Sequence, residues 1–135
     1  MWRVLKIQFV MSSRFKSLDD LDAAFPTEES CIRFLEALRW EDSYPISPYS
    51  RESKVRLRGN EYICCDTNKA FDVKTKTIFF KTSIPLIKWF KALWLVLYDD
   101  TINSVEMGRK LEVTQKTAWE MMRRIKFCLT NSNCK

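Results

Sequence analysis

The sequence contains no histidine among its 135 residues, and it has only two glycines and four prolines. Without histidine, the chain has no Ser-His-Asp triad, no Cys-His pair and none of the side chains that most often act as a general base. Two glycines cannot supply a glycine-rich phosphate loop, and the low glycine and proline content argues against disorder. We therefore expect a folded protein that is not an enzyme on its own and needs no cofactor and no small-molecule substrate.

Cysteine is present, but it is poorly arranged for disulfides or for zinc. The five cysteines are an odd number in a chain without a secretory signal, which favours reduced thiols. Cys64 and Cys65 are adjacent, which is poor geometry for a shared metal, and no C-x-x-C spacing occurs. We expect no bound metal.

Long hydrophobic runs are also missing. No apolar segment approaches the roughly 18 residues of a membrane span. The most apolar segment, residues 84–98, is interrupted by Lys88 and Lys91 and is better interpreted as a buried helix. The first ten residues are too short for a convincing signal peptide and lack a small-residue cleavage site. We expect a cytoplasmic protein that does not contact a membrane.

Positive charge is concentrated in the later part of the chain. The formal net charge is +6. Residues 1–50 carry 6 Lys and Arg against 8 Asp and Glu, whereas residues 51–135 carry 17 against 9. Such an asymmetry is typical of a surface that meets a polyanion such as nucleic acid. The length leaves room for one domain or two very small modules.

Residues 101–129 have the pattern of two short helices joined by a tight turn. Asn103 is expected to cap the first helix, with Glu106 reaching back to complete a capping box, and Thr114 to cap the second. Gly108 is small enough for the second helix to cross closely. Residues at helical spacing form the inward side: Met107, Leu111, Val113, Ala118, Met121, Met122 and Ile125. This pattern predicts a helix-turn-helix.

The outward side of the second helix is polar and cationic. The predicted DNA-binding residues are Thr114, Gln115, Lys116, Thr117, Arg123, Arg124 and Lys126. Side chains at the start of a recognition helix contact base edges, and cations further along suit phosphates. Helix pairs of this shape also serve as packing units with a solvated charged face, so the pattern alone leaves that alternative open.

The rest of the chain is predicted to alternate helices and strands in an α+β fold. Helices are expected at 17–25, 27–39 and 83–98, strands at 54–58, 61–65 and 71–80, and a hairpin turn at Gly59-Asn60. Pro45 and Pro48 predict a loop at 40–53. The predicted organisation is an extension 1–10, a helical segment 11–40, a β module 41–81, a helical module 83–130 and a tail 131–135.

Four short motifs occur in the order found in a known family. They are Arg39-Trp40 after a helix, FDVKTKTIF at 71–79, PLIKWF at 85–90, and TQKTAW at 114–119 followed by Arg124-Ile125-Lys126. Together they resemble the N-terminal region of ISXO-type insertion-sequence transposases, in which a zinc ribbon precedes a helix-turn-helix and a metal-dependent catalytic domain follows. The resemblance covers nearly the whole chain from Met11 and implies binding to double-stranded DNA.

The zinc ribbon that the resemblance implies is degenerate in this chain. The first knuckle of the family, C-P-x-C, corresponds to residues 44–47, where both thiols are lost, and the second knuckle keeps Cys64 but has Thr67 at its other ligand position. One ligand of four cannot hold zinc. The expected outcome is either a loose ribbon or packing by aromatics: Tyr44, Tyr49, Tyr62 and Phe71. Two glycines of the family are Lys76 and Glu112 here.

The leading hypothesis is the DNA-binding portion of a truncated or decayed transposase, which recognises element-end DNA without the catalytic domain. Two alternatives stay open. One is a fragment that pairs with full-length transposase, or with itself, through Trp89, Trp94 and Trp119 and inhibits the assembly; the other is a relic without function. Residues 1–10 have no counterpart in the family, so either translation begins at Met11 or the segment adds a strand to the ribbon.

Overall fold

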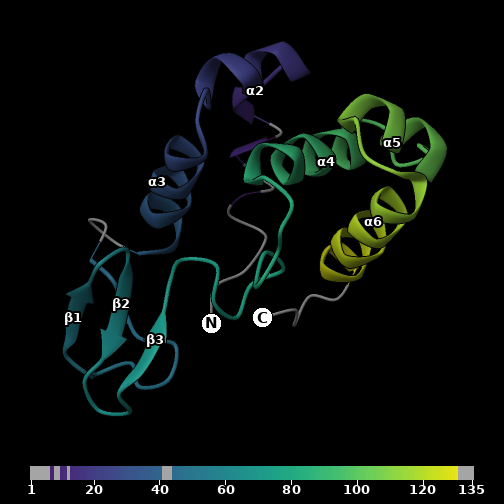
Figure 1. The fold of residues 1–135 in the computed structure, drawn as a ribbon. Coiled ribbons are helices and arrows are strands. Elements are labelled where there is room, and N and C mark those ends of the chain that lie inside the picture. Colours follow the sequence, from purple (N-terminus) through teal and green to yellow (C-terminus); the bar gives the residue numbers. More distant parts are fainter. Residues whose placement is uncertain (1–6, 8–9, 12, 41–43, 131–135) are drawn as a thin grey trace.

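A computed structural model describes residues 7, 10–11, 13–40 and 44–130, and these form a group of helices with a small sheet at one end (Figure 1). The helices are α2 (Leu18–Ala24), α3 (Glu28–Arg39), α4 (Leu86–Tyr98), α5 (Ser104–Leu111) and α6 (Gln115–Thr130). The strands are β1 (Val55–Arg58), β2 (Glu61–Cys64) and β3 (Lys69–Phe71), in one antiparallel sheet of order β1-β2-β3. The predicted α+β class is confirmed.

Helix α4 is the central element of the fold. It lies between α2 and α3 on one side and α5 and α6 on the other, and it contacts all four (Figure 1). Phe90 of α4 packs against Phe25 and Phe34, with ring centroids 5.1 and 5.7 Å away in edge-on geometry. Lys91 also forms an ion pair with Asp22 of α2 at 2.8 Å. No helix within the described ranges is long and apolar enough to cross a membrane.

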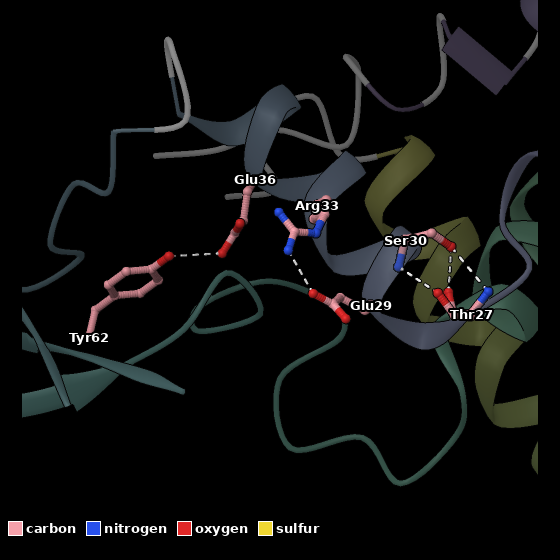
Figure 2. Close-up of polar contacts among 6 residues, drawn as sticks. All are labelled: Thr27, Glu29, Ser30, Arg33, Glu36 and Tyr62. Atoms are coloured by element: carbon pink, nitrogen blue, oxygen red, sulfur yellow. Dashed lines mark hydrogen bonds and ion pairs between the residues drawn. The ribbon is translucent and has the colours of Figure 1, made fainter. Parts of the chain in front are cut away.

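Local hydrogen bonds explain where α2 and α3 begin. The Ser17 hydroxyl accepts from the backbone N–H of Asp20 and caps α2. At α3, the backbone N–H of Ser30 donates to the Thr27 hydroxyl at 3.1 Å, and the Thr27 N–H donates to the Ser30 hydroxyl at 3.2 Å (Figure 2). These reciprocal bonds satisfy amides that a helix start leaves unpaired. Both helices lie where the sequence predicts them.

The sheet is attached to the C-terminal half of α3. The Tyr62 hydroxyl of β2 donates to the Glu36 carboxylate of α3 at 3.1 Å (Figure 2). Trp40, which ends α3, packs edge-on against Tyr62 and Phe71. The predicted hairpin turn is confirmed, because Arg58 pairs with Glu61 across Gly59-Asn60. Gly59 has φ +61°, a conformation that favours glycine.

The predicted strand at 71–80 is wrong. The third strand ends at Phe71, and the following residues form consecutive turns. The Asp72 N–H donates to the Thr75 hydroxyl at 2.9 Å, and the Lys74 N–H donates to the Asp72 carboxylate at 2.8 Å. Short polar side chains that bond to nearby backbone compete with strand pairing in this way. The segment is therefore a connection between β3 and α4.

Two other boundaries differ from the predictions. Helix α4 begins at Leu86, three residues after the expected start at Ser83. In the N-terminal extension, residues 7 and 10 have helical backbone, which contradicts a strand at those positions, and Ile7 is fully buried in the core. The remaining residues of that predicted strand, residues 41–43 of the predicted loop and the tail 131–135 lie outside the described residues.

Candidate nucleic-acid interface

Helices α5 and α6 are both capped by the residues that the sequence predicts. The Asn103 side chain accepts from the backbone N–H of Glu106 at 2.9 Å, and the Thr114 hydroxyl accepts from the N–H of Thr117 at 3.1 Å. The capping box predicted for Glu106 is wrong, since the Glu106 carboxylate bonds to Arg109 instead. Arg109, three residues after Glu106 on the same helix, pairs with the Glu106 carboxylate, which therefore does not bond to the start of α5.

The turn between α5 and α6 depends on a close backbone approach. Glu112 is left-handed, with φ 59° and ψ 46°, and it ends α5. The Val113 N–H donates to the Gly108 carbonyl at 3.0 Å. A Cβ at Gly108 would lie 3.0 Å from the Val113 carbonyl oxygen, so the predicted need for a small residue is confirmed. Lys88 of α4 donates to the Glu112 carbonyl at 3.2 Å and ties the turn to the central helix.

The inward side of the α5–α6 pair is a packed apolar surface. Its buried residues are Met107, Gly108, Leu111, Ala118, Met121, Met122 and Ile125, and Val113 is partly buried beside them. Both α4 and α5 contact α6. Burial of this side fixes which residues of α6 face solvent.

At the start of α6, most of the predicted base-contacting residues already have intramolecular partners. The Gln115 amide donates to the Ser104 hydroxyl at 3.2 Å and so links the first residues of α5 and α6. The Thr114 and Thr117 hydroxyls lie 3.0 Å apart within the cap. Lys116 is exposed. The structure therefore brings the four residues together at one helix end, where Thr114, Gln115 and Lys116 are exposed and Thr117 is half-buried.

Further along α6, a carboxylate lies among the predicted phosphate-binding cations. Arg123, Arg124 and Lys126 are exposed. Arg123 donates to the Glu120 carboxylate at 2.8 Å, and this bond raises the pKa of the Arg123 guanidinium. The same bond, with the positive charges of Arg123 and Arg124, lowers the pKa of Glu120. Glu120 therefore stays ionised and partly neutralises this cationic surface.

Two aromatic side chains on the outward side of α6 were absent from the predicted DNA-binding set. Trp119 is 53% exposed and Phe127 is 61% exposed. The Arg123 guanidinium lies over the Trp119 ring, 5.8 Å from its centroid. Positions 119, 123 and 127 are four residues apart, so they share one helix face opposite Ala118 and the other inward residues. This four-residue spacing is visible in the sequence and was the signal that could have placed the two aromatic residues on the outward side.

The tryptophans proposed for a protein partner are not equally available. Trp89 is buried and donates to the Thr82 hydroxyl at 3.0 Å, so its expected role in facing a partner is wrong. Trp94 is partly buried, stacks on Tyr98 and donates to the Phe15 carbonyl at 2.9 Å. Of the three, only Trp119 is exposed. A partner-binding surface of this kind would thus centre on α6.

The positions that the family resemblance aligns with zinc knuckles form a polar cluster beside the sheet of β1, β2 and β3. Ser47 and Cys64 are buried, whereas Tyr44 is 77% exposed. Burial raises the pKa of the Cys64 thiol, but its hydrogen bonds with Ser47, Ser53 and Thr67 outweigh burial and lower the pKa to about 6. One thiol with neutral hydroxyls is not the donor set of a structural zinc site, which uses four cysteine or histidine ligands. The residues present do not fit zinc.

The expected aromatic packing of the ribbon is present for three of the four residues. Phe71 contacts Tyr49 and Tyr62, with ring centroids 6.5 and 5.7 Å away. Lys69 and Lys76 also place their ammonium groups over the Tyr49 ring, at 5.2 and 5.5 Å from its centroid. The highly exposed Tyr44 side chain does not belong to this packing.

The chain is similar to a protein of a transposable element. It is 24% identical over 104 residues to an uncharacterised protein in transposable element ISH50 of Halobacterium salinarum. The aligned segment covers 74% of this chain but 35% of that protein, so the chain spans about a third of the relative's length. Comparisons with protein families and with solved structures each found no match. The likeness connects the chain with insertion elements and suggests a transposase-related protein.

Proposed function

We propose that this chain is the DNA-binding portion of a transposase-related protein, and that it recognises element-end DNA through a helix-turn-helix formed by α5 and α6. In this proposal α6 is the recognition helix. It binds double-stranded DNA and does not cut it. The likeness to a protein of an insertion element supports the transposase-related part of this proposal.

The observation that carries the proposal is the two-sided character of α6. Its inward side is buried against α4 and α5, and its outward side exposes Lys116, Arg123, Arg124 and Lys126. The cap at Thr114 leaves the start of α6 at the surface, next to the tight turn. A helix presented in this way can enter the major groove with its first turns while its later cations meet phosphates.

Fluorescence anisotropy with the full chain tests the proposal. Labelled duplexes taken from the DNA that flanks its gene are compared with scrambled duplexes at two salt concentrations. Tighter binding to the flanking DNA is expected. Equal binding to both that fades with salt indicates only a generic basic surface, and an absence of binding at low salt overturns the proposal.

Substitutions separate base contacts from phosphate contacts. Arg124→Ala is expected to weaken binding to every duplex alike and to lower the salt slope by about one unit. Gln115→Ala is expected to reduce the preference for flanking DNA by about 1–3 kcal/mol. Arg33→Ala is the matched control, because it removes the same charge from α3, where Arg33 is exposed and pairs with Glu29.

A second candidate function is pairing with another transposase chain. The exposed rings of Trp119 and Phe127 favour it, because large aromatic side chains are enriched in protein interfaces. Size-exclusion chromatography of the chain alone, and of the chain mixed with an intact transposase, distinguishes the candidates. A stable complex that Trp119→Ala abolishes, together with no DNA preference, favours pairing over DNA recognition.

A further inference from the structure

A fully buried thiol lies among hydroxyl groups where β2 ends. Cys64 has 0% of its side chain exposed and is the last residue of that strand. Ser47, in the loop before β1, hydrogen-bonds to the thiol, and so do Thr67 and Ser53, although the Ser53 hydroxyl donates its own proton to the Lys54 carbonyl at 2.8 Å. The cluster therefore joins two segments that are separate in sequence: the loop before β1, and the end of β2 with the turn that follows it.

The Ser47 hydroxyl has one proton to donate, and its oxygen already accepts two hydrogen bonds. Its oxygen accepts from the backbone N–H of Tyr49 at 3.0 Å and from that of Ser50 at 3.2 Å. A hydroxyl has one proton and two lone pairs, and both accepting positions are used. Its proton is therefore left for the Cys64 sulfur. This arrangement orders the loop and directs a donor at the thiol.

The turn after β2 closes around the same sulfur. The side chain and the backbone N–H of Thr67 both hydrogen-bond to the Cys64 sulfur. The Asn68 N–H donates to the Cys64 carbonyl at 2.7 Å, and Asn68 is left-handed with φ 57°. The chain thus wraps the thiol with donors from one tight turn, a conformation that asparagine tolerates better than most residues.

Direct bonds also connect the loop and the turn. The Asp66 N–H donates to the Ser53 hydroxyl at 3.0 Å, and the Ser50 hydroxyl donates to the Asp66 carboxylate at 3.0 Å. The Cys65 N–H donates to the Lys54 carbonyl at 2.9 Å. These bonds hold the two segments at the distance that the cluster requires.

We propose that Ser47, Ser53, Cys64 and Thr67 form a metal-free closure of the ribbon, in which hydrogen bonds to one thiol hold together the two segments that zinc joins in the transposases that this chain resembles. The ribbon therefore folds without zinc. The closure is a structural site separate from α6, so its test does not depend on whether the chain binds DNA.

The first test measures metal dependence in the full chain. The chain is purified without added metal, its zinc content is measured by mass spectrometry, and its urea unfolding midpoint is compared in a chelator and in excess zinc. We expect no stoichiometric zinc and the same midpoint in both. One zinc per chain, with a lower midpoint after its removal, overturns the proposal.

The second test compares two adjacent thiols. Cys64→Ala is expected to lower the urea midpoint, whereas Cys65→Ala, at an exposed thiol, leaves it unchanged. In the native chain a thiol reagent should modify Cys65 rapidly and Cys64 only on opening. Ser47→Ala is expected to speed the Cys64 reaction about tenfold, because it removes one buried hydrogen bond. Equal effects at both cysteines contradict the closure.

A gain-of-function variant avoids dependence on a destabilised chain. Ser47→Cys, Ser53→Cys and Thr67→Cys together place four sulfurs around one point, which is the tetrahedral donor set that zinc prefers. The triple variant is expected to bind Co²⁺ with the absorption bands of a tetrahedral thiolate site and to gain stability from Zn²⁺. The natural chain should show neither response. A triple variant that binds no cobalt shows that the four side chains do not converge, and it overturns the proposal.

Discussion

The carboxylate of Glu28 accepts a hydrogen bond from the backbone N–H of Leu86 at 2.9 Å, although the two residues are 58 positions apart. Leu86 is the first residue of α4, and Pro85 before it provides no side-chain cap. The first residue of α3 therefore caps α4, and its negative charge lies near the N-terminal ends of both helices. This contact ties the central helix to the segment that carries the ribbon.

Glu28→Ala is expected to lower the free energy of unfolding by about 1 kcal/mol, because it removes a cap from α4 and a favourable charge at the start of α3. Glu29→Ala is the matched control in the same turn of α3, where the carboxylate makes an exposed ion pair with Arg33. Exposed pairs contribute little. Urea unfolding followed by circular dichroism checks the difference, and equal losses at the two positions contradict the capping role.

Glu112→Gly is expected to stabilise the chain by about 1 kcal/mol, because a side chain at a left-handed residue strains the backbone and glycine does not. Glu112 has φ 59° at the end of α5. Glu112→Ala retains the strain and should change stability little, which makes it the control. Thermal unfolding of the natural chain and of the two variants gives their order of stability. A glycine variant that is no more stable than the alanine variant argues against strain at this turn.

The left-handed residues show how far the sequence alone could go. The family resemblance places glycines at positions 76 and 112, and the structure keeps both positions left-handed, with φ 60° at Lys76 and 59° at Glu112. The caps at Asn103 and Thr114 were predictable from sequence because each involves a bond to a backbone amide only three residues away. Local rules of this kind account for most of the helices.

Other features could not be predicted, either because local signals compete or because the partners are distant in sequence. Residues 71–80 are rich in strand formers, yet the bonds of Asp72 with Thr75 and Lys74 replace the ladder. The Glu28 cap on α4 and the convergence of hydroxyls on Cys64 each join segments that no short pattern relates. On α6, the predicted cations did not include their partner Glu120, although its i,i+3 spacing from Arg123 on a helix is a local signal.

Cys64 is expected to make the stability of the chain rise with pH from about 6 to about 8.5. The pKa of the thiol is about 6 when folded and close to the ordinary cysteine value of about 8.5 when unfolded. The folded state therefore binds fewer protons in this window, so stability increases with pH and is lost as the pH falls through about 6. Urea midpoints across the window should rise in the natural chain and less in Cys64→Ala.

Cys31 provides the contrast for this pH experiment. Burial and the nearby charge of Glu28 raise the pKa of the Cys31 thiol to about 12, so its contribution falls only when the pH exceeds the ordinary cysteine value of about 8.5. Measurements below that value isolate Cys64. The same pH slope in the natural chain and in Cys64→Ala would show that other groups cause it.

Ile7→Ala is expected to destabilise the chain by about 2–5 kcal/mol, the usual range for truncating a fully buried isoleucine. Ile7 lies in the core together with Met11, four residues later in helical backbone. Val10→Ala, at a partly exposed position, is the control and should have a smaller effect. Guanidinium unfolding of both variants is the measurement. A variant as stable as the natural chain would place Ile7 outside the core.

Glu120→Gln is expected to strengthen DNA binding, provided that α6 is the recognition helix. The Glu120 carboxylate accepts from Arg123 at 2.8 Å and carries the negative charge nearest to that guanidinium. Its removal frees Arg123 for a phosphate and ends the repulsion between the carboxylate and DNA, so the salt slope should increase by about one unit. Glu61→Gln makes the same charge change on β2, beside Arg58 in the ribbon. If both variants bind DNA equally more tightly at low salt with parallel salt dependence, then net charge and not the position of Arg123 on α6 governs binding.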